Sequence, residues 1–115
     1  MATKRIGAQT IKFQSPPSII GTSSIVGPKE GEGPLGSYFD LILEDDTWGQ
    51  KSFEKAEAKM QEEAIKLAIA NANLSVNDIH FLVSGDLLNQ ITSSSYTARQ
   101  IGIPYFGLYG ACSTM

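Results

Sequence analysis

Cysteine is almost absent from this sequence: its 115 residues contain only one, Cys112. A single cysteine cannot form an intramolecular disulfide, so the chain is expected in a reducing, intracellular compartment. Long apolar runs are absent as well. No stretch approaches the ~20 residues that span a bilayer, and no apolar segment follows the basic N-terminal residues as in a secretory signal. Any membrane association is therefore expected to be peripheral.

Positive charge and histidine are also scarce. Nine Lys and Arg stand against 12 Asp and Glu, giving a formal net charge of -3, and His80 is the only histidine. Without a basic face to neutralise phosphates, a nucleic-acid partner is excluded from the expected functions. The remainder is ordinary: 42% hydrophobic and 18% charged residues predict one globular domain with a modest core.

The first part of the chain, residues 1–50, is predicted to be an irregular, Gly- and Pro-rich lead. Short strands are expected at residues 11–13 and 19–26, with two prolines between them. Residues 27–36 (GPKEGEGPLG) favour a surface crossover loop over a phosphate site, because the Gly-Lys-Ser/Thr ending of a P-loop is missing. The acidic run 44–46 lacks the ligand spacing of a calcium-binding EF-hand, and Trp48 is interpreted as a surface or interface anchor.

The second part, residues 51–115, predicts a βαβαβ-type core with a mostly parallel sheet, and thus an α/β fold. A helix is expected over residues 50–72 with Ser52 as its cap, and its charged residues are interpreted as a solvated face. A strand buried on both faces is expected over 79–84, with His80 facing a helix. A helix over 95–102 ending at Gly102 and a strand over 105–109 complete the pattern.

Functional residues in such folds collect at the carboxyl ends of the strands, which here are residues 85–90 and 110–113. Asp86 is interpreted as a structural organiser of its turn slightly ahead of a direct ligand contact, and Asn89 and Gln90 offer neutral donors. Cys112 has three interpretations: a nucleophile, a thiol lining a ligand pocket, or a small residue packed under a following helix. Ser113 stands where a helix start would attract an anion.

Three segments, GPKEGEGPLGSYFD, SGDLLNQ and YTARQIGIPYFGLYGACST, closely resemble the first third of the stage V sporulation protein AD family of spore-forming bacteria. The resemblance runs from about residue 11 to residue 115. It implies a thiolase-like fold of two repeated halves, about three times the length of this chain, so that residues 1–115 are a partial N-terminal, thiolase-like half-domain. The family's second half is then missing here.

The resemblance implies a non-catalytic protein that binds dipicolinic acid, free or as its calcium complex, and contributes to its uptake into the developing spore. It implies partners among the other stage V sporulation membrane proteins, a peripheral position at the spore inner membrane, and no cofactor. The expected ligand-binding residues are Asp86, Asn89, Gln90, Cys112 and Ser113.

Two alternatives remain open. One is a thiolase-type acyltransferase relative, since thiolase-fold enzymes carry their nucleophilic cysteine at the position of Cys112, with partner residues from the second half. The other is a truncated chain without independent activity. Because the cut sheet leaves apolar surface exposed, the isolated chain is expected to self-associate or to need its second half. The residues expected on the uncovered side are Leu82, Val83, Phe106 and Leu108.

Overall fold

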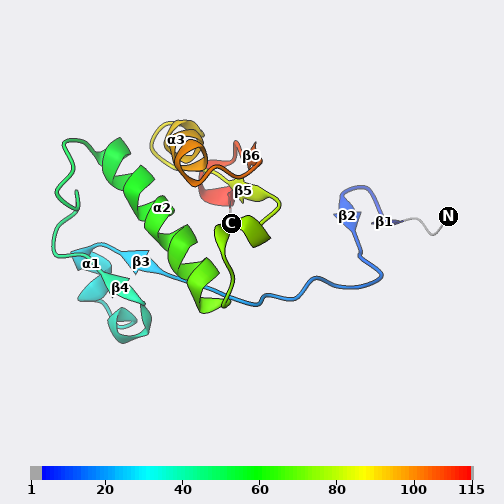
Figure 1. The fold of residues 1–115 in the computed structure, drawn as a ribbon, viewed down its shortest axis with the longest axis horizontal. Helices are drawn as coiled ribbons and strands as arrows, with labels where there is room; N and C mark the ends of the chain where they lie inside the picture. The colour runs from blue at the N-terminus through cyan, green and yellow to red at the C-terminus, as the bar shows by residue number, and fades with distance from the viewer. Residues whose placement is uncertain (1–3, 115) are drawn as a thin grey trace.

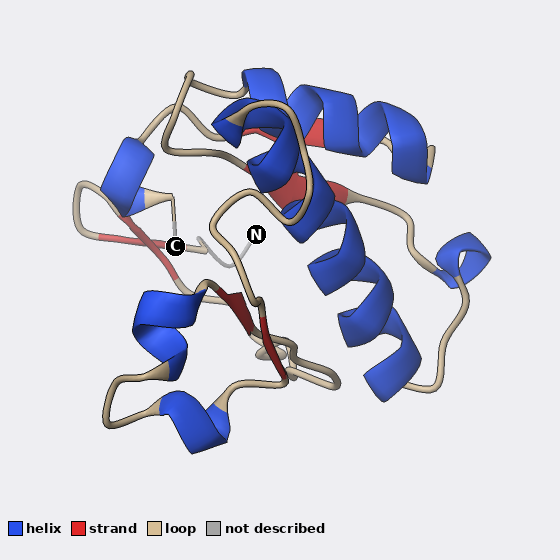
Figure 2. Ribbon diagram, turned by 90° about the vertical axis from the view of Figure 1, so that its left-hand side faces the viewer, coloured by secondary structure: helices blue, strands red, loops and turns tan. Residues whose placement is uncertain are grey.

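The computed structural model describes residues 4–114, which form short strands around one long and one medium helix (Figures 1 and 2). The elements, with η for a 3-10 turn, are β1 (Arg5–Ile6), β2 (Thr10–Ile11), β3 (Ile25–Val26), α1 (Pro28–Gly31), η1 (Gly36–Tyr38), β4 (Leu41–Ile42), α2 (Phe53–Asn71), η2 (Val76–Asp78), β5 (Leu82–Ser84), α3 (Thr92–Ile101), β6 (Tyr105–Gly107) and η3 (Ala111–Ser113). Mixed helices and short parallel sheets confirm the α/β class.

The strands pair two by two. β5 and β6 are parallel, with Val83 opposite Phe106, and α3 connects them, so this part is a βαβ unit. β3 and β4 form a second parallel pair, and β1 and β2 an antiparallel hairpin. The predicted βαβαβ core requires three strands in one sheet. Among the described residues, β4 precedes α2 but pairs with β3 and not with β5, so the strands form separate two-stranded sheets. The sequence pattern missed this because it indicates strands and not their partners.

Helix α2 begins directly after its capping residue, Ser52. Ser52 has an extended backbone, and its side-chain oxygen accepts a hydrogen bond from the backbone N–H of Lys55 at 3.3 Å, as predicted. The helix therefore starts at Phe53, three residues after the predicted start.

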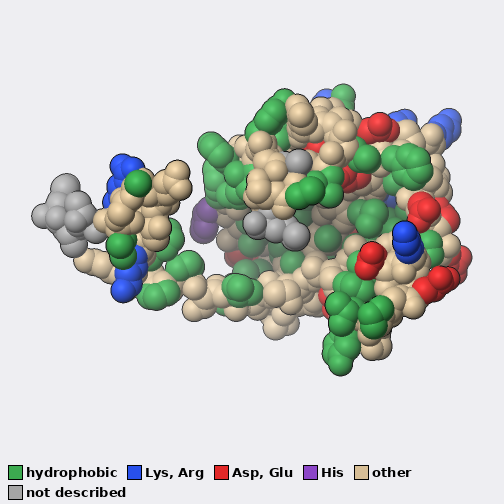
Figure 3. Space-filling model, turned by 180° about the vertical axis from the view of Figure 1, so that it is seen from behind, with side chains coloured by type: hydrophobic (Ala, Val, Ile, Leu, Met, Phe, Trp, Pro, Cys, Tyr) green, Lys and Arg blue, Asp and Glu red, His purple; other side chains and the backbone are tan. Residues whose placement is uncertain are grey.

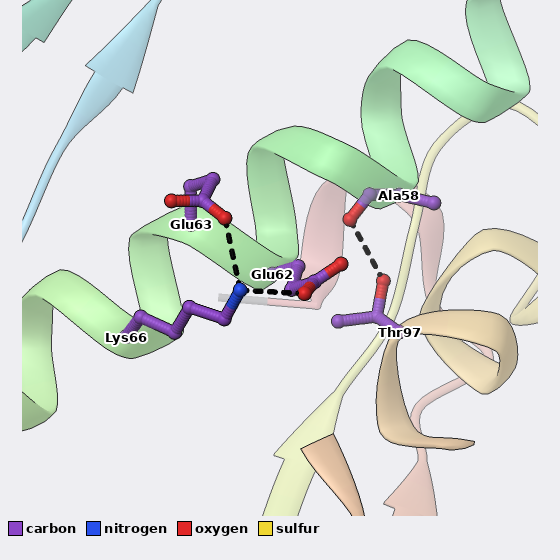
Figure 4. A network of polar contacts seen from close by, with 5 residues as sticks. All are labelled: Ala58, Glu62, Glu63, Lys66 and Thr97. Atoms are coloured by element: carbon purple, nitrogen blue, oxygen red, sulfur yellow. Dashed lines mark hydrogen bonds and ion pairs between the residues drawn. The ribbon is translucent and has the colours of Figure 1, made fainter. Parts of the chain in front are cut away.

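Small side chains let α3 pack closely on α2. Ala56, Ser93, Thr97 and Ala98 are buried, and the Thr97 hydroxyl donates to the Ala58 carbonyl oxygen at 3.0 Å (Figure 4). Next to this contact, Lys66 bridges Glu62 at 2.6 Å and Glu63 at 3.0 Å. These are exposed pairs within one helix, so each contributes only a few tenths of a kcal/mol, about 0.3–0.5.

Helix α3 starts earlier than predicted, at Thr92 rather than Ser95. The sequence pattern missed the first turn of α3 because the side chains that accept hydrogen bonds from its backbone N–H groups, Asp86 and Asn89, lie several residues before the helix. Its end is as predicted: Gly102 adopts the left-handed conformation with φ 78° and closes the helix.

One face of the β5–β6 sheet is uncovered among the described residues. Phe81, Val83 and Phe106 are 54%, 53% and 59% exposed, and we call this set the open face. The prediction that this strand is buried on both faces is therefore wrong. So is the placement of His80 against a helix, since His80 is exposed and precedes β5. Of the four residues expected to be uncovered, Val83 and Phe106 are exposed, whereas Leu82 and Leu108 are half-buried.

The first 50 residues contain more local structure than the predicted loop. The loop expectation for residues 27–36 is wrong in part, because α1 begins there with Pro28 in its first turn and η1 starts at Gly36. The predicted strands shorten to β2 and β3, which are two residues each. The boundary at residue 50 stays a prediction.

An extended segment, residues 4–20, projects from the rest of the described chain (Figure 1) and is called the N-terminal arm. It makes the described residues elongated, 52 × 30 × 29 Å, with a radius of gyration of 16.1 Å. A compact chain of this length has about 13 Å. The apolar core is correspondingly small, and its buried members among the described residues are Leu43, Ala56, Ala98 and Ile103.

Candidate functional site

Two loops meet at the carboxyl ends of β5 and β6, and we call them the strand-end loops (residues 85–91 and 108–114). The Leu108 N–H donates to the Ser84 carbonyl oxygen at 2.8 Å. A Cβ atom at Gly85 would lie 2.6 Å from the Leu108 carbonyl oxygen and 2.7 Å from Thr114 Cγ2. Only glycine allows this approach. The structure thus brings together the two segments that contain all five predicted site residues.

The Asp86 side chain is buried and faces the start of α3. It is 5% exposed, and its carboxylate accepts hydrogen bonds from the backbone N–H of Ser94 at 2.9 Å and of Asn89 at 3.4 Å. Ile91, the residue before α3, has φ 68° and supplies no side-chain cap. Asp86 therefore caps α3 through the backbone N–H of Ser94, which lies eight residues further along the chain in the first turn of the helix. These contacts agree with the interpretation of Asp86 as an organiser.

Asn89 supports the same helix start. Its Oδ1 atom accepts from the Ser93 backbone N–H at 3.3 Å and the Ser93 hydroxyl at 3.2 Å, and its carbonyl oxygen accepts from the Thr92 hydroxyl at 2.9 Å. The side-chain NH2 group makes no hydrogen bond within residues 4–114 and remains a potential donor. Asn89 also lines the groove between α2 and α3.

Gln90 links the two loops. Its Oε1 atom accepts a hydrogen bond from the Tyr109 hydroxyl at 2.5 Å, and both side chains are exposed. Sequence reasoning did not include Tyr109 in the site. Its position, immediately before the Gly-Ala-Cys-Ser-Thr turn, was the available signal.

Cys112 and Ser113 lie in η3 and are exposed. The Ser113 hydroxyl and backbone N–H both contact the Gly110 carbonyl oxygen, at 2.7 and 2.9 Å, so this turn is closed locally. His80 precedes β5 and so lies at the opposite end of the parallel pair, four residues or about 13 Å of strand before Ser84. The chain's histidine is thus poorly placed to act as a base for Cys112.

Helix α2 positions the first strand-end loop through two side chains that sequence reasoning missed. Glu57 Oε1 accepts the Leu87 N–H at 3.1 Å, and the Gln61 side-chain amide donates to the Gly85 carbonyl oxygen at 3.3 Å. The sequence pattern indicated a solvated face there. The signal that was available is their spacing of four residues, which places both on one side of a helix.

A groove of about 580 Å³ runs between α2 and α3. Its charged residues are mixed, namely Glu54, Lys55, Lys59 and Glu62, and Asn89 is the one predicted site residue that lines it. Lys59 is held by Trp48: the ammonium lies 4.4 Å from the ring centroid and donates to the Trp48 carbonyl oxygen at 3.2 Å. Trp48 is half-buried and packs on α2, so the observed contact is intramolecular.

The acidic run 44–46 forms a local turn. The Thr47 hydroxyl and backbone N–H donate to Asp45 at 2.8 Å each, and these bonds lower the pKa of Asp45 below its ordinary value of 3.8. Within residues 4–114, no group of three or more His, Cys, Asp or Glu side chains is arranged to hold a metal ion. In the same part of the chain, no helix combines the length and apolar character needed to cross a membrane.

Sequence comparisons relate the chain to a known protein family. The family model of stage V sporulation protein AD matches residues 7–115. Over 111 residues the chain is 42% identical to stage V sporulation protein AD of Bacillus subtilis (strain 168). The aligned region covers 96% of this chain and 33% of that protein. The chain thus spans a third of the length of this curated relative. It belongs to the stage V sporulation protein AD family.

Proposed function

We propose that this chain forms one wall of a non-catalytic binding site for dipicolinic acid, free or as its calcium complex. The site is completed in the longer protein, which contributes to uptake of the acid into the developing spore. The observation that carries the proposal is the Gln90–Tyr109 hydrogen bond, which joins the two motif-bearing loops at one end of the sheet. Family membership supports the same assignment.

The donors at this sheet end suit a planar aromatic dianion. Gln90 offers a side-chain NH2 group that makes no hydrogen bond within residues 4–114, and Tyr109 offers a flat ring whose hydroxyl holds Gln90 in place by donating to its Oε1 atom. The Ser113 hydroxyl donates to the Gly110 carbonyl oxygen in this structure and can rotate toward a ligand, and all three side chains are exposed. Neutral donors and an aromatic surface bind carboxylates without requiring a buried charge. Cys112 lies beside Ser113 and provides a small polarizable surface at the same place.

The negative charge of Asp86 does not oppose this ligand. Its carboxylate is buried and directed at the α3 N-terminus, so the charge is shared with backbone N–H groups rather than presented to the loops' surface. In this proposal Asp86 and Asn89 organise the site, while Gln90, Tyr109 and Ser113 contact the ligand. The protein acts peripherally at the spore inner membrane with other stage V sporulation membrane proteins.

Isothermal titration calorimetry with dipicolinate, with and without calcium, tests the assignment in a version extended to the full family length. Gln90→Ala is expected to weaken binding by about tenfold, because one hydrogen bond to a charged ligand is lost. Tyr109→Phe removes the hydrogen bond that holds Gln90 in place, so it is also expected to weaken binding. Asn77→Ala, an exposed amide in η2, is the matched control and should bind as the parent does. Unchanged affinity in both site variants would place the site in the other two thirds of the protein.

A further inference from the structure

Two neighbouring residues of the first strand-end loop have a backbone conformation that non-glycine residues rarely adopt. Gln90 has φ 53° and Ile91 has φ 68°, both in the left-handed region, directly before helix α3. Ile91 is branched at Cβ, and a branched residue in this region is an outlier that costs conformational free energy. We call this pair the left-handed junction. Such conformations persist only where surrounding contacts hold them, and they cluster at functional sites.

Two hydroxyl groups hold the left-handed junction. Ser94 is completely buried, and its hydroxyl donates to the Ile91 carbonyl oxygen at 3.1 Å. The hydroxyl of Tyr105, in strand β6, lies 2.6 Å from the Ser94 hydroxyl. Because the single Ser94 hydroxyl proton is directed at Ile91, the Tyr105 hydroxyl donates this second bond. The opposite direction would leave Tyr105 only the Ser84 carbonyl oxygen as acceptor, at 3.4 Å. The hydrogen bonds therefore connect β6 to the junction through α3.

Other contacts fix the junction as well. Figure 3 shows Asp and Glu side chains at the surface, but Asp86 is 5% exposed and accepts from two backbone N–H groups, one before and one after the junction. A Cβ atom at Gly107 would lie 3.3 Å from Ile91 Cγ2 and 2.8 Å from the Tyr105 hydroxyl oxygen. Glycine in β6 thus makes room for both side chains, and Ile91 packs directly on the strand.

We propose that Tyr105 is a positioning residue of the ligand site: through Ser94 it holds the left-handed junction, and so fixes the direction of the Gln90 side chain. This inference rests on the proposed function, in which Gln90 contacts the ligand. The Gln90 Oε1 atom accepts from the Tyr109 hydroxyl, and its NH2 group has no partner within residues 4–114. Relaxation to negative φ would redirect this side chain, because the Cα–Cβ bond turns with the backbone. Ordering the amide in advance lowers the entropic cost of binding.

NMR spectroscopy of the 115-residue chain tests the holding step without a ligand. At positive φ the amide hydrogen lies close to the Hα atom of the same residue, so Gln90 and Ile91 should each give a strong intraresidue NOE. Tyr105→Phe removes the hydroxyl and should weaken both NOEs, whereas Tyr38→Phe, which removes an exposed hydroxyl in η1, should not. Circular dichroism checks that each variant retains α2 and α3. Equal NOEs in Tyr105→Phe and the parent chain would refute the holding role.

Calorimetry with dipicolinate, in the version extended to the full family length, tests the consequence for binding. Tyr105→Phe should weaken binding by about three- to tenfold, and no more than Gln90→Ala does. In the Gln90→Ala background it should weaken binding no further, because the side chain that it positions is gone. Ile91→Gly adopts positive φ without strain, so in that background Tyr105→Phe should have little effect.

The outcomes separate this inference from the proposed function. If Tyr105→Phe weakens binding equally in the parent, the Gln90→Ala and the Ile91→Gly backgrounds, its effect is a general loss of packing and the positioning role is refuted. Unchanged affinity in Gln90→Ala alone would overturn the proposed function. The NOE comparison would then still decide whether Tyr105 holds the junction.

Discussion

Replacing Asp86 by alanine should remove the main side-chain support of the α3 N-terminus. The buried carboxylate accepts two backbone N–H groups, at 2.9 and 3.4 Å, and the residue at the helix start offers no side-chain cap. Losing a hydrogen bond to a charged group costs about 1.5–3 kcal/mol, and losing a cap costs about 1 kcal/mol. Because the 2.9 Å bond is the better of the two, we expect a loss of about 2 kcal/mol.

Urea unfolding followed by circular dichroism measures this loss, which corresponds to a fall in Tm of roughly 10 °C. Asp86→Asn keeps an acceptor but not the charge, so it should lose only about 1 kcal/mol. Asp46→Ala is the control, because this exposed carboxylate makes no hydrogen bond within residues 4–114 and should stay within about 0.5 kcal/mol of the parent. If Asp86→Ala and Asp46→Ala unfold at the same urea concentration, the capping argument is wrong.

Three further outcomes follow from the structure. Gly85→Ala places a methyl group against the Leu108 carbonyl oxygen and Thr114, so urea unfolding should show a loss of about 1–3 kcal/mol. The Ser75 backbone N–H, which has the larger effect, and the Ser75 hydroxyl both donate hydrogen bonds to Asp78 and lower its pKa below the ordinary value of 3.8. An NMR titration of Asp78 should therefore have its midpoint below pH 3.8. Because the Asp78 pKa is lower in the folded state, this carboxylate stabilises the fold above pH 3.8, and the stabilisation is lost as the pH falls through the folded-state pKa. Ser75→Ala removes the hydroxyl bond and should bring the Asp78 titration midpoint closer to pH 3.8. Incubation with acetyl-CoA should leave Cys112 unmodified, and an acetyl adduct in the intact mass would contradict non-catalytic function.

The local elements were predictable because they depend on short-range chemistry. Ser52 caps α2 through an N–H three residues on, and Gly102 ends α3 because glycine tolerates φ 78°. The sequence also placed both candidate segments at strand ends, since parallel strands end at a common edge of a sheet. Membership in the stage V sporulation protein AD family was recognisable from three segments, GPKEGEGPLGSYFD, SGDLLNQ and YTARQIGIPYFGLYGACST.

Strand partners, burial and side-chain direction were decided by the tertiary structure. Nothing local shows that β4 pairs with β3, that one face of β5 is uncovered, or that Asp86 turns inward to the backbone N–H of Ser94, eight residues further along the chain. Glu57 and Gln61 look like solvated helix residues until the β5 loop lies against them. A sequence determines which groups can donate, accept or avoid water, and only the packed chain decides which of them meet.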